Sequence, residues 1–143
     1  MRNILTAIVL IFLFLMLLVP KASPGVRVDI VKVVDGDTVV ASIDDNQFKI
    51  RLKDIDCYEG TINERAQWQA KKFHLNIEDI TAGGELAKQA IETELKDKQI
   101  TFEFKGIDKY NRALGYIYAN NKNVNKRMLT TSYCHPYEKM TKD

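Results

Sequence analysis

Arg51-Leu-Lys-Asp-Ile-Asp-Cys-Tyr-Glu59 is the stretch in which an alternating strand gives way to a cluster of carboxylates. Residues 48–53 alternate between apolar and cationic side chains, which predicts a strand with one apolar and one positively charged face. Asp54, Asp56 and Glu59 then follow in a segment that we expect to be irregular. Carboxylates this close repel one another unless a cation lies among them, and their oxygens suit Ca²⁺ or Mg²⁺. A solvated turn with ordinary surface charges is the alternative.

The first 25 residues differ from the rest of the chain. Arg2 supplies a positive charge, and Ile4–Val19 is an almost uninterrupted apolar run. This pattern is typical of a secretory signal peptide, and an uncleaved signal anchor is the alternative. We therefore expect residues 1–25 to be a signal peptide or anchor and residues 26–143 to form one folded domain. The expected location is outside the cytoplasm, secreted or periplasmic, or tethered to a membrane through residues 4–19.

The charge balance limits how this domain can meet an anionic partner. The chain holds 21 Lys and Arg residues against 19 Asp and Glu residues. Two of the basic residues, Arg2 and Lys21, fall in the first segment and no acid does, so the remainder is close to neutral. A general nucleic-acid binder usually carries an excess of basic residues. Any recognition of phosphate must therefore be local.

Hydrophobic periodicity predicts a small barrel with helices. Period-2 alternation indicates five strands, over residues 26–34, 38–43, 48–53, 100–105 and 113–119. Helical periodicity indicates helices over residues 64–74, 84–98 and 124–131, with another short one starting at 76–80. The residues expected to face inward on these helices are Leu86, Ala87, Ala90, Ile91, Leu95, Met128 and Leu129. This order predicts a mainly β (α+β) fold, a five-stranded OB-fold barrel with helices that follows the N-terminal signal or anchor segment.

Asp37 is the residue that links the hairpin turn to the carboxylate cluster. Asp35-Gly36 is a common hairpin signal and by itself requires no chemistry. Asp37 lies past the glycine, where the turn does not need a second carboxylate. If the third strand lies beside this hairpin, Asp37 would meet Asp56 at one end of the sheet. Two such carboxylates, with a backbone carbonyl and waters, would form a Ca²⁺ site.

Taken together, these motifs resemble those of the staphylococcal-nuclease-like thermonucleases over about residues 33–134. Each motif is weak alone, whereas the ordered set is specific. The matching segments are Asp35-Gly-Asp-Thr38, Arg51, Asp56-x-x-Glu59, Asp108-Lys-Tyr-Asn-Arg-Ala-Leu-Gly-Tyr-Ile-Tyr118 and Val124-Asn125. The resemblance implies an enzyme that hydrolyses DNA and RNA phosphodiesters and leaves 3′-phosphorylated products. We expect this enzyme to be a monomer.

The resemblance also implies a role for individual residues. One Ca²⁺ ion would be held by Asp37, Asp56 and the backbone carbonyl of Cys57. Glu59 would position or deprotonate the attacking water. Two guanidiniums, matching Arg51 and Arg112, would hold the phosphoryl oxygens in a bidentate manner that lysine cannot reproduce. Substrate binding would fall to Lys109 and Tyr110.

Departures from the family pattern concern the loop that carries Glu59. The family often has a small residue and then proline where Cys57 and Tyr58 stand here, so a rigid element is lost. The family's fold implies that this segment runs near the end of the second helix, where Cys134 falls. We therefore expect a Cys57–Cys134 disulfide, in an oxidising compartment. Residues 60–84 form an insertion near the same edge, with no assigned role.

The same fold also suits a function from another class. A non-catalytic OB-fold module could bind nucleic acid or another anionic ligand with the same scaffold. The presence of all five charged family positions argues against such a degenerate site. A purely structural domain would leave the charge cluster unexplained.

Overall fold

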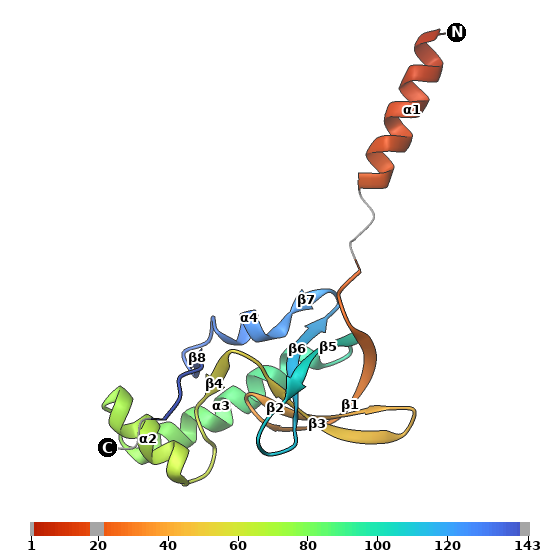
Figure 1. The fold of residues 1–143 in the computed structure, drawn as a ribbon. Helices are drawn as coiled ribbons and strands as arrows, with labels where there is room; N and C mark the ends of the chain where they lie inside the picture. Colours follow the sequence, from red (N-terminus) through yellow and green to blue (C-terminus); the bar gives the residue numbers. More distant parts are fainter. Residues whose placement is uncertain (1, 18–21, 141–143) are drawn as a thin grey trace.

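The computed structural model describes residues 2–17 and 22–140 of the chain (Figure 1). The N-terminal helix α1 covers Arg2–Leu17 and projects away from the remainder of the fold. Within the described ranges, no helix is both long enough and apolar enough to cross a membrane. Residues 18–21, which belong to the expected signal or anchor segment, lie outside the described residues.

Five strands close into the barrel that the alternation predicted. The sheet order is β3-β2-β1-β5-β6, and a parallel pairing of β3 with β6 joins its two edges. A short strand β7, Lys122–Asn123, pairs with β6. The barrel strands are β1 Val26–Asp35, β2 Thr38–Ile43, β3 Asn46–Leu52, β5 Ile100–Ile107 and β6 Ala113–Ala119.

The barrel interior is filled by the apolar residues that alternate along these strands. Val39, Ile50, Leu52 and Ile117 are fully buried within one contiguous core. Two helices cover this core from outside, because α3 (Ile77–Leu95) contributes Ile91 and its neighbours on the same face and α4 (Val124–Met128) contributes Val124 and Met128. Burial of each such side chain stabilises the fold by roughly 1.5–3 kcal/mol, which explains why the strand assignments follow the periodicity.

The segment after β3 forms a second, two-stranded sheet, so our expectation of an irregular loop was wrong. β4, Ile55–Cys57, pairs antiparallel with β8, Cys134–Pro136, near the C-terminus. All three residues of β4 are buried. Their backbone groups need partners there, and a segment 77 residues away supplies them. No local pattern reveals such a distant partner.

Residues 77–95 form one helix rather than two. α2 covers Glu64–Phe73, and α3 runs without a break over Ile77–Leu95, straight through Gly83 and Gly84. Glycine usually weakens a helix, but here it permits close packing. A Cβ on Gly83 would lie 2.6 Å from the Tyr58 ring, and one on Gly84 would lie 2.3 Å from the Glu59 carbonyl carbon. The two glycines therefore let the loop after β4 lie directly on α3.

Three further details differ from the periodicity. Leu86 is 42% exposed, because the buried stripe of α3 follows Ile80, Ala87 and Ile91 instead. The last helix, α4, covers only Val124–Met128. Met128 is buried as expected, whereas Leu129 lies past the helix end and is 37% exposed.

The inserted residues 60–84 carry a small core of their own. Tyr58, Ala66 and Ile80 pack together there, joined by Phe73. Tyr58 and Phe73 make an edge-to-face contact with ring centroids 5.6 Å apart. The insertion is therefore a packed helical hairpin that covers the loop carrying Glu59.

Candidate active site

Asp37, Arg51 and Asp56 meet at one end of the barrel. Arg51 is the register partner of Thr38 in the β2–β3 pairing. Asp37 directly precedes Thr38 and therefore lies close to Arg51. Arg51 Nη2 lies 3.2 Å from Asp37 Oδ2 and 3.5 Å from Asp56 Oδ1. Its Nη1 donates to the backbone carbonyls of Leu52 and Ile55, at 2.7 and 2.9 Å. The two carboxylates expected from the sequence therefore converge on a single cationic nitrogen.

The Asp37 carboxylate is buried and held by the backbone around it. Its side chain is only 8% exposed, and Oδ2 accepts a hydrogen bond from the Cys57 backbone N–H at 2.8 Å. Burial raises the pKa of Asp37 to about 7, although the Arg51 charge and the Cys57 N–H act in the opposite direction. The nearby Asp35 and Asp56 carboxylates raise this pKa further. A buried carboxylate in this situation gains from any additional cation that comes close.

Asp56 and the Cys57 carbonyl are covered by two side chains of α2. Arg65 Nη2 lies 2.8 Å from Asp56 Oδ2, and its Nε donates to both carboxylate oxygens at 3.1 and 3.2 Å. Gln69 Nε2 donates to Asp56 Oδ2 and to the Cys57 carbonyl, each at 2.9 Å. The inserted helix therefore contacts two of the three groups that the resemblance implies as metal ligands.

The residues fit a divalent cation by their donor chemistry. Two carboxylates and one main-chain carbonyl are the hard oxygen ligands that Ca²⁺ takes. Asp37 Oδ2 and Asp56 Oδ1 already converge on the positive charge of Arg51. In the part of the chain that the structure describes, no three His, Cys, Asp or Glu side chains form a metal-binding group. The expected set contains only two such side chains, because its third member is a backbone oxygen.

Glu59 lies at the edge of this cluster. Its Oε2 accepts a hydrogen bond from Asn63 Nδ2 at 2.8 Å, and its backbone N–H donates to Gln69 Oε1 at 3.1 Å. Burial raises the pKa of Glu59, the Asn63 hydrogen bond opposes this shift, and the charges of Asp35 and Asp56 add to it. A carboxylate with a raised pKa is a stronger base than an ordinary surface glutamate.

Arg112 approaches from the loop between β5 and β6. Asp108 organises this loop, because its Oδ1 accepts the backbone N–H groups of Tyr110 and Arg112 at 2.9 and 3.0 Å. Asp108 Oδ2 also accepts from Arg112 Nε at 2.7 Å. Arg112 Nη1 lies 3.5 Å from Thr38 Oγ1, which in turn donates to Asp37 Oδ1 at 3.2 Å. Thr38 thus connects the second arginine to the carboxylate cluster.

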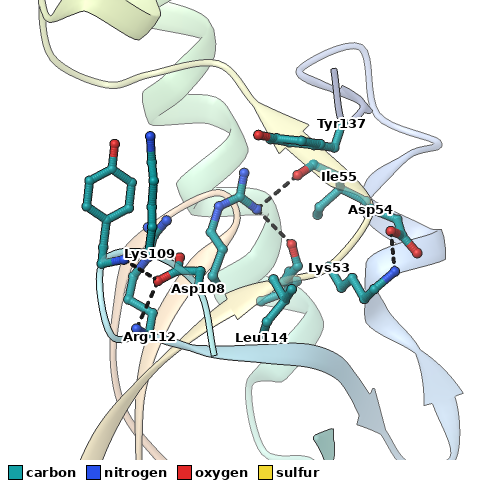
Figure 2. Close-up of a pocket in the computed structure, with 11 residues that line it drawn as sticks. Lys53, Asp54, Ile55, Asp108, Lys109, Arg112, Leu114 and Tyr137 are labelled. Atoms are coloured by element: carbon teal, nitrogen blue, oxygen red, sulfur yellow. Dashed lines mark hydrogen bonds and ion pairs between the residues drawn. The ribbon is translucent and has the colours of Figure 1, made fainter. Parts of the chain in front are cut away.

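A pocket of about 370 Å³ opens beside the two arginines (Figure 2). Arg51 and Arg112 line it, and Tyr137 lies across it from Lys109. Tyr110 is 66% exposed, and its ring lies 5.3 Å from the Arg112 guanidinium carbon. The pocket therefore combines cationic groups with exposed aromatic rings, the combination that suits phosphates joined to bases.

The expected disulfide is present. Cys57 and Cys134 are register partners in the β4–β8 sheet and are joined to each other. Because Cys57 directly follows Asp56, the bridge ties the carboxylate cluster to the C-terminal segment. It stands where the family pattern has a proline-stiffened loop.

The sequence pattern did not predict three residues of the site, namely Asn63, Arg65 and Gln69. Asn63 caps α2, since its Oδ1 accepts the Ala66 backbone N–H at 2.8 Å. Gln69 offered a detectable signal, because it lies three residues after Ala66 and four before Phe73 on the apolar face of the predicted helix. A polar side chain on a buried stripe requires a partner. The identity of that partner was not contained in the pattern.

Comparison with known proteins gives the same family as the motifs. Residues 49–143 match the model of a protein family described as staphylococcal nuclease homologue. An uncharacterized protein of Methanocaldococcus jannaschii is 36% identical over 122 residues, which cover 76% of this chain and 58% of that protein. Protein ParB of Escherichia coli is 28% identical over 102 residues, covering 69% of this chain and 47% of ParB. This chain thus spans about half the length of these curated relatives. It belongs to the family of staphylococcal nuclease homologues.

Proposed function

We propose that this protein is a Ca²⁺-dependent phosphodiesterase that hydrolyses DNA and RNA with little sequence specificity. The products would carry 3′-phosphates. The observation that carries this proposal is the convergence of Asp37 and Asp56 on Arg51, within 3.5 Å, beside a pocket that Arg51 and Arg112 line. Membership of the nuclease homologue family supports it.

The chain's own residues supply the groups that phosphodiester hydrolysis needs. Glu59 would accept a proton from the attacking water, a role that typically contributes 10²–10⁴-fold. Arg51 and Arg112 would bind the non-bridging phosphoryl oxygens as negative charge develops on them. The P–O bond to the 5′ oxygen would break, and the 5′ oxygen would leave as a hydroxyl after taking up a proton from solvent water. The oxygen of the attacking water would remain on phosphorus, so the phosphate would stay on the 3′ side.

Asp37, Asp56 and the Cys57 carbonyl would hold the Ca²⁺ ion. When bound, this ion would neutralise phosphate charge and polarise a phosphoryl oxygen. Lys109 and Tyr110 would contact a neighbouring phosphate, sugar or base from the loop that Asp108 organises. Such contacts address the backbone and any accessible base, which is why we propose little sequence specificity.

The location and assembly of the protein belong to the same proposal. A nuclease of broad specificity is best kept outside the cytoplasm, and the disulfide suits an oxidising compartment. We propose that residues 1–25 direct export, with the protein either released or tethered through residues 4–19. Residues 26–143 would act as a monomer.

The test is hydrolysis of single-stranded DNA and of RNA by the full chain in mild detergent, with Ca²⁺ or with chelator. Glu59→Gln is the diagnostic variant, and Glu64→Gln is its control because Glu64 is exposed in the first turn of α2. We expect Ca²⁺-dependent cleavage that Glu59→Gln abolishes and Glu64→Gln retains. Binding of both strands without cleavage, with any divalent ion, would instead establish a non-catalytic OB-fold module.

A further inference from the structure

Helix α2 places a fixed positive charge against one of the proposed metal ligands. Arg65 makes three short contacts with the Asp56 carboxylate, at 2.8, 3.1 and 3.2 Å. Two further contacts fix its position. Arg65 Nη2 donates to the Glu138 carbonyl at 3.0 Å, and the Arg65 guanidinium carbon lies 4.3 Å from the Trp68 ring centre. Its side chain is only 14% exposed. Arg65 is therefore a largely buried part of the site rather than a solvent-exposed side chain.

Gln69, one turn further along the same helix, makes neutral contacts with the same group of residues. It is fully buried. Its amide nitrogen donates to Asp56 Oδ2 and to the Cys57 carbonyl, and its amide oxygen accepts the Glu59 backbone N–H. One side chain thus contacts the segment that carries the site at three residues, Asp56, Cys57 and Glu59.

The charge of Arg65 and the neutral amide of Gln69 would act on a bound cation in opposite directions. A carboxylate has about four lone-pair sites, and Asp56 already receives hydrogen bonds from Arg51, Arg65 and Gln69. A divalent ion at Asp56 would compete with the Arg65 guanidinium for these oxygens and would be repelled by its charge. Gln69 carries no charge, and it contacts Asp56 at Oδ2 and not at Oδ1. Outer groups of this kind orient ligand oxygens and strengthen metal binding.

We propose that α2 sets the affinity of the site for Ca²⁺, with Arg65 weakening binding and Gln69 strengthening it. This inference rests on the proposed function, because it assigns regulation to that same metal site. It gives the inserted hairpin a role that the barrel alone does not explain. Extracellular Ca²⁺ modules work with Kd values of about 10⁻⁴–10⁻³ M, and a site weakened by an adjacent arginine belongs in that range.

The test is calorimetric titration of the full, chelator-treated chain with Ca²⁺. Arg65→Gln removes the charge, and Arg65→Lys is the matched control because it keeps the charge. Gln69→Met keeps the volume of the side chain and removes its hydrogen bonds. We expect Arg65→Gln to bind Ca²⁺ between about tenfold and a hundredfold more tightly than wild type. Arg65→Lys should stay close to wild type, and Gln69→Met should bind at least about tenfold more weakly.

The opposite signs separate this inference from a merely structural role of α2. If both helix residues only stabilised the fold, Arg65→Gln and Gln69→Met would weaken Ca²⁺ binding together, and the inference would be overturned. Unchanged affinity in Arg65→Gln, with clear binding by wild type, would overturn the role of Arg65 and leave the proposed function intact. Absence of Ca²⁺ binding in wild type and all variants would overturn both the inference and the Ca²⁺ requirement of the proposed function.

Discussion

Cys57 and Cys134 face each other across the β4–β8 sheet, with Cα atoms 3.9 Å apart, and a disulfide joins them. The bridge closes a loop of 77 residues that contains α2, α3 and the β5–β6 hairpin. It also fixes the residue next to Asp56. The same covalent bond therefore restrains the unfolded chain and holds β4, the strand that carries two of the three candidate metal ligands, Asp56 and the Cys57 carbonyl.

Reduction of this disulfide should lower the free energy of unfolding by about 4 kcal/mol, because the unfolded chain regains the entropy of a long open loop. Urea unfolding with and without dithiothreitol measures the effect. A double Cys57→Ala, Cys134→Ala variant should show the lower stability and no response to dithiothreitol. Equal stability of the reduced and oxidised wild type would contradict the prediction.

Gly84→Ala should damage the protein although alanine is the better helix former by about 1 kcal/mol. A Cβ at this position would lie 2.3 Å from the Glu59 carbonyl carbon and the Gly60 nitrogen, so the loop must move away. We expect a net destabilisation of about 1–3 kcal/mol and a loss of nuclease activity larger than the stability change explains. Urea unfolding and hydrolysis assays measure the two effects. Gln89→Ala, on the exposed face of the same helix, should be neutral, and a stabilised, fully active Gly84→Ala would contradict the packing argument.

Arg112→Lys should lower kcat by roughly 10²-fold while changing KM little, because lysine cannot place two parallel donors on a developing phosphoryl charge. It also loses the contact of Arg112 Nε with Asp108 at 2.7 Å. Steady-state hydrolysis of single-stranded DNA measures both constants. The control is Arg127→Lys, since Arg127 is paired with Glu94 on a helix surface. A kcat equal to wild type in Arg112→Lys would show that this residue only supports the loop.

Asp108→Asn should destabilise the protein in a pH-dependent way. Burial raises the pKa of Asp108, but the hydrogen bonds from Arg112 and Tyr110 outweigh it, and the pKa falls below its ordinary value of 3.8. The ionised carboxylate therefore contributes stability that is complete above about pH 4 and is lost as the pH falls through the lowered pKa. We expect a deficit of about 1–3 kcal/mol for Asp108→Asn at pH 7.

Urea unfolding of both proteins between pH 7 and pH 2 checks this prediction. The difference in free energy of unfolding between wild type and Asp108→Asn should shrink below pH 4. A constant difference across this range would show that the carboxylate charge at Asp108 contributes nothing.

Tyr110→Ala should weaken binding of single-stranded DNA by roughly 1–3 kcal/mol, because the exposed ring offers a surface on which a base can stack. Tyr110→Phe keeps that ring and should bind like wild type. Fluorescence anisotropy with labelled oligonucleotide and chelator present measures affinity without cleavage. Equal losses in the two variants would assign the contact to the hydroxyl group instead.

Much of this fold could be predicted from local sequence alone. The alternation of residues 38–43 and 113–119 predicted strands β2 and β6 with their observed bounds. A period of two shows which side chains face the core. The sequence also predicted a tight turn between the first two strands, but the turn residues are Gly36 and Asp37 rather than Asp35 and Gly36, because Asp35 is the last residue of β1 and pairs with Thr38. The same local reading wrongly ended a helix before Gly83 and Gly84. These glycines lie inside α3 because the loop at residues 58–60 packs against them and leaves no room for a Cβ.

The residues of the candidate site also fall into those that the sequence could predict and those that only the structure reveals. The sequence was sufficient to predict the barrel strands and the meeting of Asp37 with Asp56, and the family resemblance implied the pairing of the two cysteines. The pairing of β4 with β8 and the contacts of Arg65 and Gln69 with Asp56 are seen only in the folded structure. The physical reason is that periodicity and turn chemistry act between neighbours in the chain. The partner of a buried polar group, by contrast, is chosen by which distant segments the packed core brings together.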